Sequence, residues 1–258
     1  MKHFPVILAV LALLCGPQVR AQYAVRADSS AVAASAFRSS DLIAPGALIA
    51  VGVGIHCFAH EAVDVPVNRW FQNWRGDRPA LDFDNYLRHL PIVMDLGLGL
   101  VGAQAEHGAL DRFIEASIGA LALGAISGGL KELVHSPRPN AWDAKSFPSG
   151  HTDWAFLGAE LVRMEYGWDW GIPAYLVATT VAVMRNYNNW HWMSDVIFGA
   201  GVGLLSAQIG RWLLEPTKRL FHIPTYSWGS GRRDVQAVLA PRVDPVSGTF
   251  CAGLALNF

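Results

Sequence analysis

The 258-residue sequence has few charged residues: Asp, Glu, Lys and Arg make up 16% of it, whereas an average soluble domain has about 25%. It also lacks a surplus of either sign, because 20 Lys and Arg stand against 21 Asp and Glu, for a formal net charge of −1. Binding to a nucleic-acid backbone needs a clustered cationic surplus, so nucleic acid is not an expected partner. Apolar residues make up 52% of the chain, which excludes intrinsic disorder.

Cysteine is scarce, with three residues at positions 15, 57 and 251. A small fold held together by disulfides is therefore excluded. Cys57 and Cys251 could form a disulfide in an oxidising compartment, but two distant cysteines in an apolar chain are more often free.

Residues 1–21 are typical of a secretory signal peptide, since Lys2 precedes a short apolar run and small residues lead to a cleavage point after Ala21. The apolar run is too short to cross a membrane comfortably. A polar lead segment follows over residues 22–41. The remaining length allows one large domain or two small ones, with an interior deep enough for a site.

Long uninterrupted hydrophobic runs are missing, because charged residues such as Asp95, Glu115 and Glu160 interrupt the apolar stretches. These stretches cover residues 42–58, 90–105, 112–134, 152–166, 171–187 and 194–214. We expect an all-α fold, a six-helix bundle that is polytopic in a membrane. Frequent Gly and Ala favour close packing of membrane helices, and tryptophans near the predicted helix ends suit the membrane interface. The alternative is a secreted, water-soluble helical domain with an apolar core.

Two regions lie outside the predicted helical domain, which covers residues 42–214. Residues 59–88 mix aromatic and cationic side chains, which would suit a headgroup-level surface, although a solvated loop is the simpler interpretation. In the C-terminal tail, residues 215–258, alternating apolar residues flank a turn-forming sequence. This pattern predicts a short C-terminal β-hairpin.

Polar residues whose side chains can take part in a reaction form three short clusters near predicted helix ends. In the first, Lys131 and Arg138 stand seven residues apart, which is two helical turns, so both can face one point. In the second, Ser149, Gly150 and His151 open an apolar helical stretch. The free N–H groups and the positive dipole end at such a helix start favour an anion.

The third cluster contains Arg185, His191 and Asp195. His191 and Asp195 are neighbours on a helix, so the carboxylate can hold one ring N–H while the other nitrogen stays an unprotonated nucleophile or base. Together the clusters supply three permanent cations, an anion-binding helix start and two histidines. This combination indicates a phosphoryl site, because phosphoryl transfer needs mainly positioning and charge complementary to the phosphate oxygens.

The clusters resemble the three motifs of the type 2 phosphatidic acid phosphatase and vanadium haloperoxidase superfamily. Its pattern is Lys, six residues, Arg-Pro; then Pro-Ser-Gly-His; then Ser-Arg, five residues, His, three residues, Asp. The matching residues are Lys131 with Arg138 and Pro139, then Pro148, Ser149, Gly150 and His151, then Arg185, His191 and Asp195. The resemblance covers roughly residues 90–214, and Met184 stands where the pattern has serine.

The resemblance implies a catalytic domain that needs no metal or other cofactor. His191 would attack phosphorus and form a phosphohistidine, His151 would protonate the leaving oxygen, and Asp195 would orient His191. The phosphate oxygens would be held by Lys131, Arg138, Ser149, the Gly150 N–H and Arg185. In agreement, no group of Asp, Glu, His and Cys with convincing metal-ligand spacing stands beside the three clusters.

We therefore expect a phosphoric monoester hydrolase that acts on a phosphomonoester or diphosphate of a membrane lipid. Candidate substrates are phosphatidate, phosphatidylglycerophosphate, an isoprenoid diphosphate and lipid A. The lipid and the bilayer are the expected partners, with no obligatory protein partner. Two alternatives keep the same residues: a soluble secreted acid phosphatase for small phosphomonoesters, and a haloperoxidase in which His191 coordinates vanadate.

The expected location is the membrane of a bacterial cell envelope with the site facing the periplasm, or the periplasm itself for a soluble enzyme. This expectation conflicts with other parts of the prediction. Cleavage after Ala21 followed by six full spans would put residues 22–41 outside and the catalytic loops inside. Either the stretch 42–58 does not cross, or the domain does not fully span, or the site faces the cytoplasm.

Overall fold

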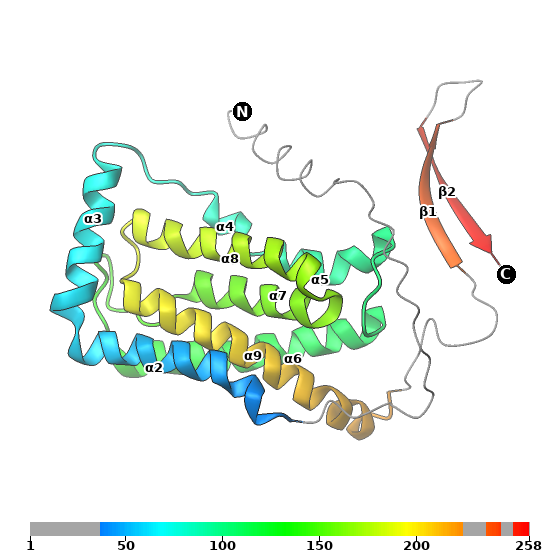
Figure 1. Cartoon of the computed structure of the whole chain (residues 1–258), viewed down its shortest axis with the longest axis horizontal. Helices are drawn as coiled ribbons and strands as arrows, with labels where there is room; N and C mark the ends of the chain where they lie inside the picture. The colour runs from blue at the N-terminus through cyan, green and yellow to red at the C-terminus, as the bar shows by residue number, and fades with distance from the viewer. Residues whose placement is uncertain (1–36, 224–235, 244–249, 258) are drawn as a thin grey trace. The chain divides into compact units, whose positions relative to one another are not determined.

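The computed structural model describes residues 37–223, 236–243 and 250–257, with side chains described for 37–223, and this part of the chain is mostly helical (Figure 1). Three single turns, η1 (Ser39–Leu42), η2 (His60–Asp64) and η3 (Leu98–Val101), accompany the α-helices. The α-helices are α2 (Ile43–Phe58), α3 (Val65–Arg75), α4 (Asp84–Leu87), α5 (Leu90–Gly97), α6 (Ala109–Val134), α7 (Gly150–Tyr166), α8 (Trp168–Tyr187) and α9 (Met193–Leu220). The predicted signal peptide lies outside the described residues.

Five of the six apolar stretches lie largely within one helix each, but the described part contains more helical elements than six. The stretch 90–105 is not one helix, because α5 ends at Gly97 and η3 continues only to Val101. Gly102 follows with a φ of 92°, a left-handed conformation that ends a helix and favours glycine. At the other boundary, α9 extends six residues past the predicted end of the helical domain, to Leu220.

The expectation of a solvated loop over residues 59–88 is wrong for much of this segment, which contains η2, α3 and α4. Pro66 stands in the first turn of α3, where its missing N–H removes no helical hydrogen bond. On the inner side of α3, Phe71 is buried and the Asn68 side chain donates to Asn189 Oδ1 at 2.7 Å. Tertiary contacts of this kind stabilise a helix of only 11 residues, which would be marginal on its own.

Helix α9 packs against α2, α6 and α7, and α7 in turn packs against α5 and α8 (Figure 1). Glycines allow the close approach of α9 and α7. A Cβ atom on Gly203 would clash with the backbone oxygen of Asp153, and one on Gly199 would lie 2.9 Å from the backbone oxygen of Ser149. The first half of α9 is thereby held directly against the start of α7.

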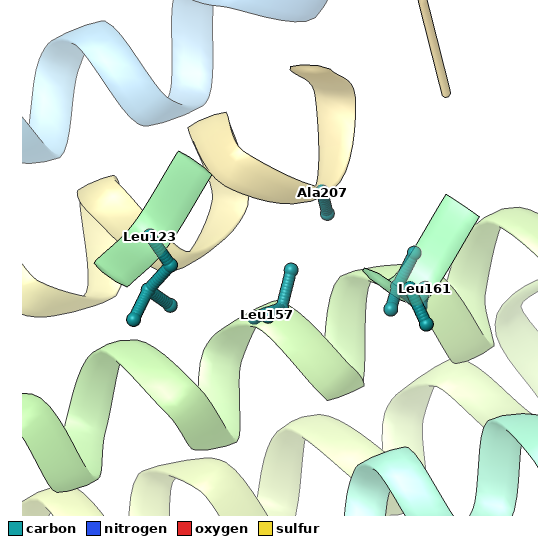
Figure 2. Packing of buried hydrophobic residues seen from close by; sticks show 5 residues of the cluster. Leu123, Leu157, Leu161 and Ala207 are labelled. Atoms are coloured by element: carbon teal, nitrogen blue, oxygen red, sulfur yellow. The ribbon is translucent and has the colours of Figure 1, made fainter. Parts of the chain in front are cut away.

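A buried apolar cluster joins three of these helices (Figure 2). Leu157 and Leu161 of α7 are almost fully buried, and Leu123 of α6 and Ala207 of α9 pack around them. Because close-packed side chains resist sliding of one helix past another, this cluster also fixes the helix ends that carry the polar motifs.

Three helical segments are long and apolar enough to cross a membrane: Ser39–Phe58, Ala109–Val134 and Met193–Leu220. Only 11% and 28% of the most apolar windows of the first two segments are buried, against 72% for the third. Helices α2 and α6 therefore present apolar faces outward, including the exposed Val51 and Leu121. Such faces suit contact with lipid tails, and we treat the chain as a membrane protein.

Strands β1 (Gln236–Val243) and β2 (Phe250–Asn257) pair antiparallel, with Gln236 opposite Asn257 and Val243 opposite Phe250. The predicted C-terminal hairpin falls on this segment. Residues 244–249 and the strand side chains, including that of Cys251, lie outside the described part, so the hairpin stays a prediction. Cys57 is exposed and forms no disulfide.

Candidate active site

The three sequence motifs meet where the C-terminal ends of α6 and α8 approach the N-terminal ends of α7 and α9. Hydrogen bonds join each pair of motifs. Arg138 Nη1 lies 3.0 Å from Nε2 of His191, and the Ser149 backbone N–H donates to the Asp195 carbonyl oxygen at 3.2 Å. Lys131 Nζ donates to the carbonyl oxygen of Pro148. Residues spread over 65 positions of the sequence therefore form one polar site.

His191 is 2% exposed and lies between a carboxylate and a guanidinium. Its Nδ1 is 3.4 Å from Oδ2 of Asp195, and its Nε2 faces Arg138. Since a guanidinium can only donate, Nε2 accepts and the ring proton lies on Nδ1, toward the aspartate. Burial, and then the positive charges of Arg185, Arg138 and Lys131, lower the pKa of His191 well below its usual value. The ring is a neutral base whose lone pair faces the cations.

Asp195 is fully buried, and its Oδ2 accepts three hydrogen bonds. The donors are the Ser146 hydroxyl, the Trp192 backbone N–H at 2.9 Å and Nδ1 of His191. Sequence analysis gave Ser146 no role, because no spacing rule connects it with an aspartate 49 residues away. The only available signal was its position two residues before the Pro-Ser-Gly-His motif.

Two of the predicted phosphate-binding cations are held in place by the protein itself. The ammonium of Lys131 donates to the carbonyl oxygens of Pro148 and, at 3.2 Å, Lys145. Arg138 is fixed by a 2.7 Å ion pair between its Nε and Oδ1 of Asp143. These contacts use part of each cation's donor capacity and position both charges before a ligand enters.

Arg185, the third predicted cation, is 5% exposed and forms a 2.6 Å ion pair with the buried Asp84. Its Nε–H has no hydrogen-bond partner within the described residues. Arg185 and Arg138 also share the ring of Trp190, with guanidinium carbons 5.6 and 5.5 Å from its centroid. Because an unpaired buried donor is costly, Arg185 has a donor available for an anion.

His151 lies in the first turn of α7, with Nε2 2.8 Å from Oδ1 of Asn85 and Nδ1 3.4 Å from Nη1 of Arg88. Since Arg88 can only donate, the ring proton lies on Nε2. Burial, and then the charges of Arg185 and Arg88, lower the pKa of His151. A bound phosphate would offset these charges, but not the burial, and would therefore raise the pKa of His151 toward its usual value.

Ser149 and Gly150 differ in what they can offer a ligand. The Ser149 hydroxyl is fully buried and lies 2.9 Å from Oγ1 of Thr152, so a phosphate would have to compete with that contact. Gly150 is partly exposed, and a Cβ atom there would lie 3.9 Å from Cε of Lys131. Because the first N–H groups of a helix lack helical partners, the start of α7 and the Lys131 ammonium can hold the same anion.

Sequence analysis also missed residues 81–89, which lie against the site. Besides the contacts of Asp84, Asn85 and Arg88 described above, the backbone N–H and carbonyl of Leu81 each form a 2.8 Å hydrogen bond with the Asn188 side chain. The segment offered only its polar composition as a signal, and no motif marks it. It supplies two of the contacts to His151 and the carboxylate that balances Arg185.

A second polar cluster lies at the other end of α7. Single ligand atoms of His107, Glu115 and Glu165 lie within 4.8 Å of one another, which is the kind of donor set that can hold a metal ion. However, Arg211 donates to Glu115 at 2.8 Å and to Glu165 at 2.6 Å. The guanidinium balances the two carboxylates, and the cluster ties α6, α7 and α9 together away from the three motifs.

Comparison with known proteins matches residues 114–218 to the PAP2 superfamily. A lipid A 1-phosphatase of Porphyromonas gingivalis is 33% identical over 149 residues, which is 55% of this chain and 32% of that protein. The chain thus spans about a third of the length of this curated relative.

Two solved structures are also similar to the chain. LpxE of Aquifex aeolicus has a TM-score of 0.45 and 22% identity, covering 57% of this chain and 93% of its own. The first transmembrane PAP2-type phosphatidylglycerolphosphate phosphatase of Bacillus subtilis has a TM-score of 0.47 and 19% identity, covering 69% and 96%.

Proposed function

We propose that this chain, whose residues 114–218 match the PAP2 superfamily, is a membrane-embedded phosphatase of that superfamily that acts on a lipid through a phosphohistidine. One observation carries the proposal: the His191 ring lies between Asp195 and Arg138, with Nε2 toward the guanidinium. An imidazole that is kept neutral and oriented in this way is an activated nucleophile directed at an anion site.

The phosphoryl group would bind against Lys131, Arg138, Ser149, the Gly150 N–H and Arg185. Nε2 of His191 forms a bond to phosphorus as the bond to the leaving oxygen breaks, and His151, in its imidazolium form, passes its Nε2 proton to that oxygen and becomes neutral. Asp195 stabilises the positive charge that develops on the His191 ring. Water, deprotonated by His151, then cleaves the phosphohistidine. The permanent cations supply the charge that a divalent metal supplies in other phosphatases.

A phosphorylated membrane lipid is the proposed substrate class. The relative from Porphyromonas gingivalis is named a lipid A 1-phosphatase, which makes phosphorylated lipid A the first compound to assay. The outward apolar faces of α2 and α6 support a substrate that reaches the site from the bilayer. The other substrates to assay are phosphatidate, phosphatidylglycerophosphate and an isoprenoid diphosphate.

The test measures phosphate release by the purified protein in detergent with a chelator present. Replacement His191→Ala should lower the rate by a factor of about 1,000 or more and abolish an acid-labile, base-stable phosphoprotein. His60→Ala is the matched control, because His60 and Asp64 form a similar histidine–aspartate pair outside the three motifs. They are four residues apart in the sequence, as His191 and Asp195 are, and His60 Nδ1 lies 3.0 Å from Asp64 Oδ2. Undiminished phosphate release from the His191 variant would refute the assignment of His191 as the nucleophile.

We also propose that the site faces the periplasm. Helix α2 leads toward the site, because Asp64, six residues beyond its end, accepts hydrogen bonds from the backbone N–H and hydroxyl of Ser194 at the start of α9. A periplasmic site therefore requires residue 39 at the cytoplasmic face if α2 crosses the membrane. A cleaved signal peptide followed by a crossing α2 would give the opposite orientation.

Cysteine labelling distinguishes the two orientations. The exposed residues Ala80 and Ala144 lie near the site, whereas the exposed Trp168 begins α8 at the far end. In a variant without native cysteines, Ala80→Cys and Ala144→Cys should react with an impermeant maleimide in cells with a permeabilised outer membrane. Trp168→Cys should react only after lysis. The reverse pattern would place the site in the cytoplasm.

The two alternatives make different predictions. A soluble acid phosphatase would leave the membrane pellet in an alkaline carbonate wash, whereas three long apolar helices favour retention. A haloperoxidase would oxidise bromide when vanadate is added, and we expect no such activity.

A further inference from the structure

A third histidine, His56, approaches the carboxylate that supports the proposed nucleophile. It stands in the last turn of α2, outside the three sequence motifs, and the reaction proposed above gives it no role. Helix α2 lies side by side with α9, the helix that begins just before Asp195 (Figure 1). How the two helices are aligned therefore decides whether His56 meets the active site.

Two close contacts fix the alignment of α2 and α9. A Cβ atom on Gly201 would lie 2.9 Å from the backbone nitrogen of Ile49. One on Gly52 would lie 2.6 Å from Cβ of Phe198. The contact thus moves forward along α2 as it moves back along α9, so the two helices run antiparallel. Because residues one turn apart share a helix face, the next turn of α2 meets the first turn of α9.

His56 and Asp195 occupy these two turns. A ring contact supports their proximity, since the His56 ring centroid is 4.5 Å from that of Phe147. Phe147 directly follows Ser146, whose hydroxyl donates to Oδ2 of Asp195. A charge on the His56 ring also acts on Asp195. The helix alignment, the ring contact and the electrostatics agree in placing His56 close to the buried carboxylate.

Each of these two side chains has one buried atom without a hydrogen-bond partner among residues 37–223. These atoms are Nδ1 of His56 and Oδ1 of Asp195. Buried polar atoms are nearly always hydrogen-bonded, because an unpaired one costs free energy. The two atoms are complementary, since a histidine Nδ1 can donate and a carboxylate oxygen accepts. No direct hydrogen bond joins them, and one water molecule between them would satisfy both.

We propose that His56 is a positioning residue for the nucleophile, and that its Nδ1–H holds Oδ1 of Asp195 through one bridging water molecule. The inference rests on the proposed function. The water accepts from His56 and donates to Oδ1, so both oxygens of Asp195 accept hydrogen bonds. This arrangement keeps the carboxylate ionised and its Oδ2 directed at Nδ1 of His191. The positive charge that develops on His191 during phosphoryl transfer then meets a fixed negative charge.

Kinetic measurements test this role with phosphate release from dioctanoyl phosphatidate in detergent. His56→Leu removes the donor and should lower kcat by about 10-fold, as expected for losing a hydrogen bond to a charged group, with KM changed by less than about 3-fold. His56→Asn should keep kcat within about 3-fold of wild type, because its amide nitrogen can take the place of Nδ1. His60→Leu is the control and should keep the wild-type kcat, since Nδ1 of His60 pairs with Asp64 instead.

The two His56 variants separate positioning from packing. A wild-type kcat in His56→Leu, or equal losses in His56→Leu and His56→Asn, would mean that His56 only packs against Phe147. Either result would overturn the inference, because a packing role does not depend on an N–H group in the place of Nδ1.

Thermal unfolding provides a measurement that does not depend on turnover. His56→Leu leaves Oδ1 without its donor only when residue 195 is a carboxylate, so it should lower Tm by about 2–4 °C more in the wild-type background than in Asp195→Asn. Equal shifts of Tm in the two backgrounds would refute the link between His56 and Asp195. If the shifts differ as expected but the wild-type protein releases phosphate from none of the lipids named above, the proposed function fails and the link stands.

Discussion

Replacing Asp195 with asparagine tests how far the chemistry depends on the carboxylate behind His191. The substitution can keep the local geometry, because an amide oxygen in the place of Oδ2 can accept from Ser146, Trp192 and His191 as before. The amide NH2 would then replace Oδ1, which has no hydrogen-bond partner within the described residues. The change therefore removes mainly the negative charge.

The expected magnitude follows from the 3.4 Å separation of Asp195 Oδ2 and His191 Nδ1. Two unit charges at this distance interact by about 5 kcal/mol at an effective dielectric constant of about 20. If about half a positive charge develops on the ring in the transition state, the loss is about 2.5 kcal/mol, which lowers kcat by roughly 70-fold. KM should change by less than about 3-fold, because Asp195 does not face the phosphate.

The assay is steady-state phosphate release from a short-chain lipid phosphate, with circular dichroism and thermal unfolding as controls for folding. Ser146→Ala provides a graded comparison, since it removes one of the three donors to Oδ2 and should lower kcat by about 10-fold. If Asp195→Asn kept more than about a third of the wild-type kcat, or raised KM alone, the assignment of Asp195 as the support of a developing charge would be wrong.

Three further predictions concern packing and protonation. Gly203→Ala should destabilise the protein by roughly 1–3 kcal/mol, because its Cβ atom would clash with the backbone oxygen of Asp153, and an unchanged Tm would contradict this packing. Burial lowers the pKa of His107, but the hydrogen bond and charge of Glu165 more than offset this and raise it overall. This stabilising contribution is complete below pH 6.5 and is lost as the pH rises through the folded-state pKa, so Tm should fall more over that range in wild type than in His107→Gln. The lowered pKa of His191 predicts a ring that stays neutral at pH 6.5, and an NMR titration of its ring carbon near that pH would contradict the prediction.

The meeting of the three motifs could be anticipated from sequence because successive helices in a bundle tend to run antiparallel. Lys131 ends one helix and His151 begins the next, while Arg185 ends the third and Asp195 begins the fourth. The connections over residues 135–149 and 188–192 then bring these four ends to the same side. The spacing of His191 and Asp195 added a local contact that depends only on helix geometry.

Other features depend on contacts that sequence spacing does not encode. Helix α3 has few inward-facing apolar residues, and part of its attachment is polar, as in the hydrogen bond from Asn68 to Asn189. Its mixed aromatic and cationic side chains are also common in solvated surface segments, so the sequence alone favoured a loop. Likewise, the hydroxyl of Ser146 reaches Asp195 only because α7 and α9 pack at glycine positions, among them Gly199.

The segment from Asp84 to Arg88 shows most clearly why tertiary structure was needed. An aspartate and an arginine four residues apart are normally interpreted as a surface ion pair within one helical turn. Here the pair is divided, because Asp84 binds Arg185 at 2.6 Å and Arg88 turns to His151. The division leaves a guanidinium without a local carboxylate beside a cavity. Spacing along one helix therefore gives neither residue its actual partner, and only the tertiary contacts identify both.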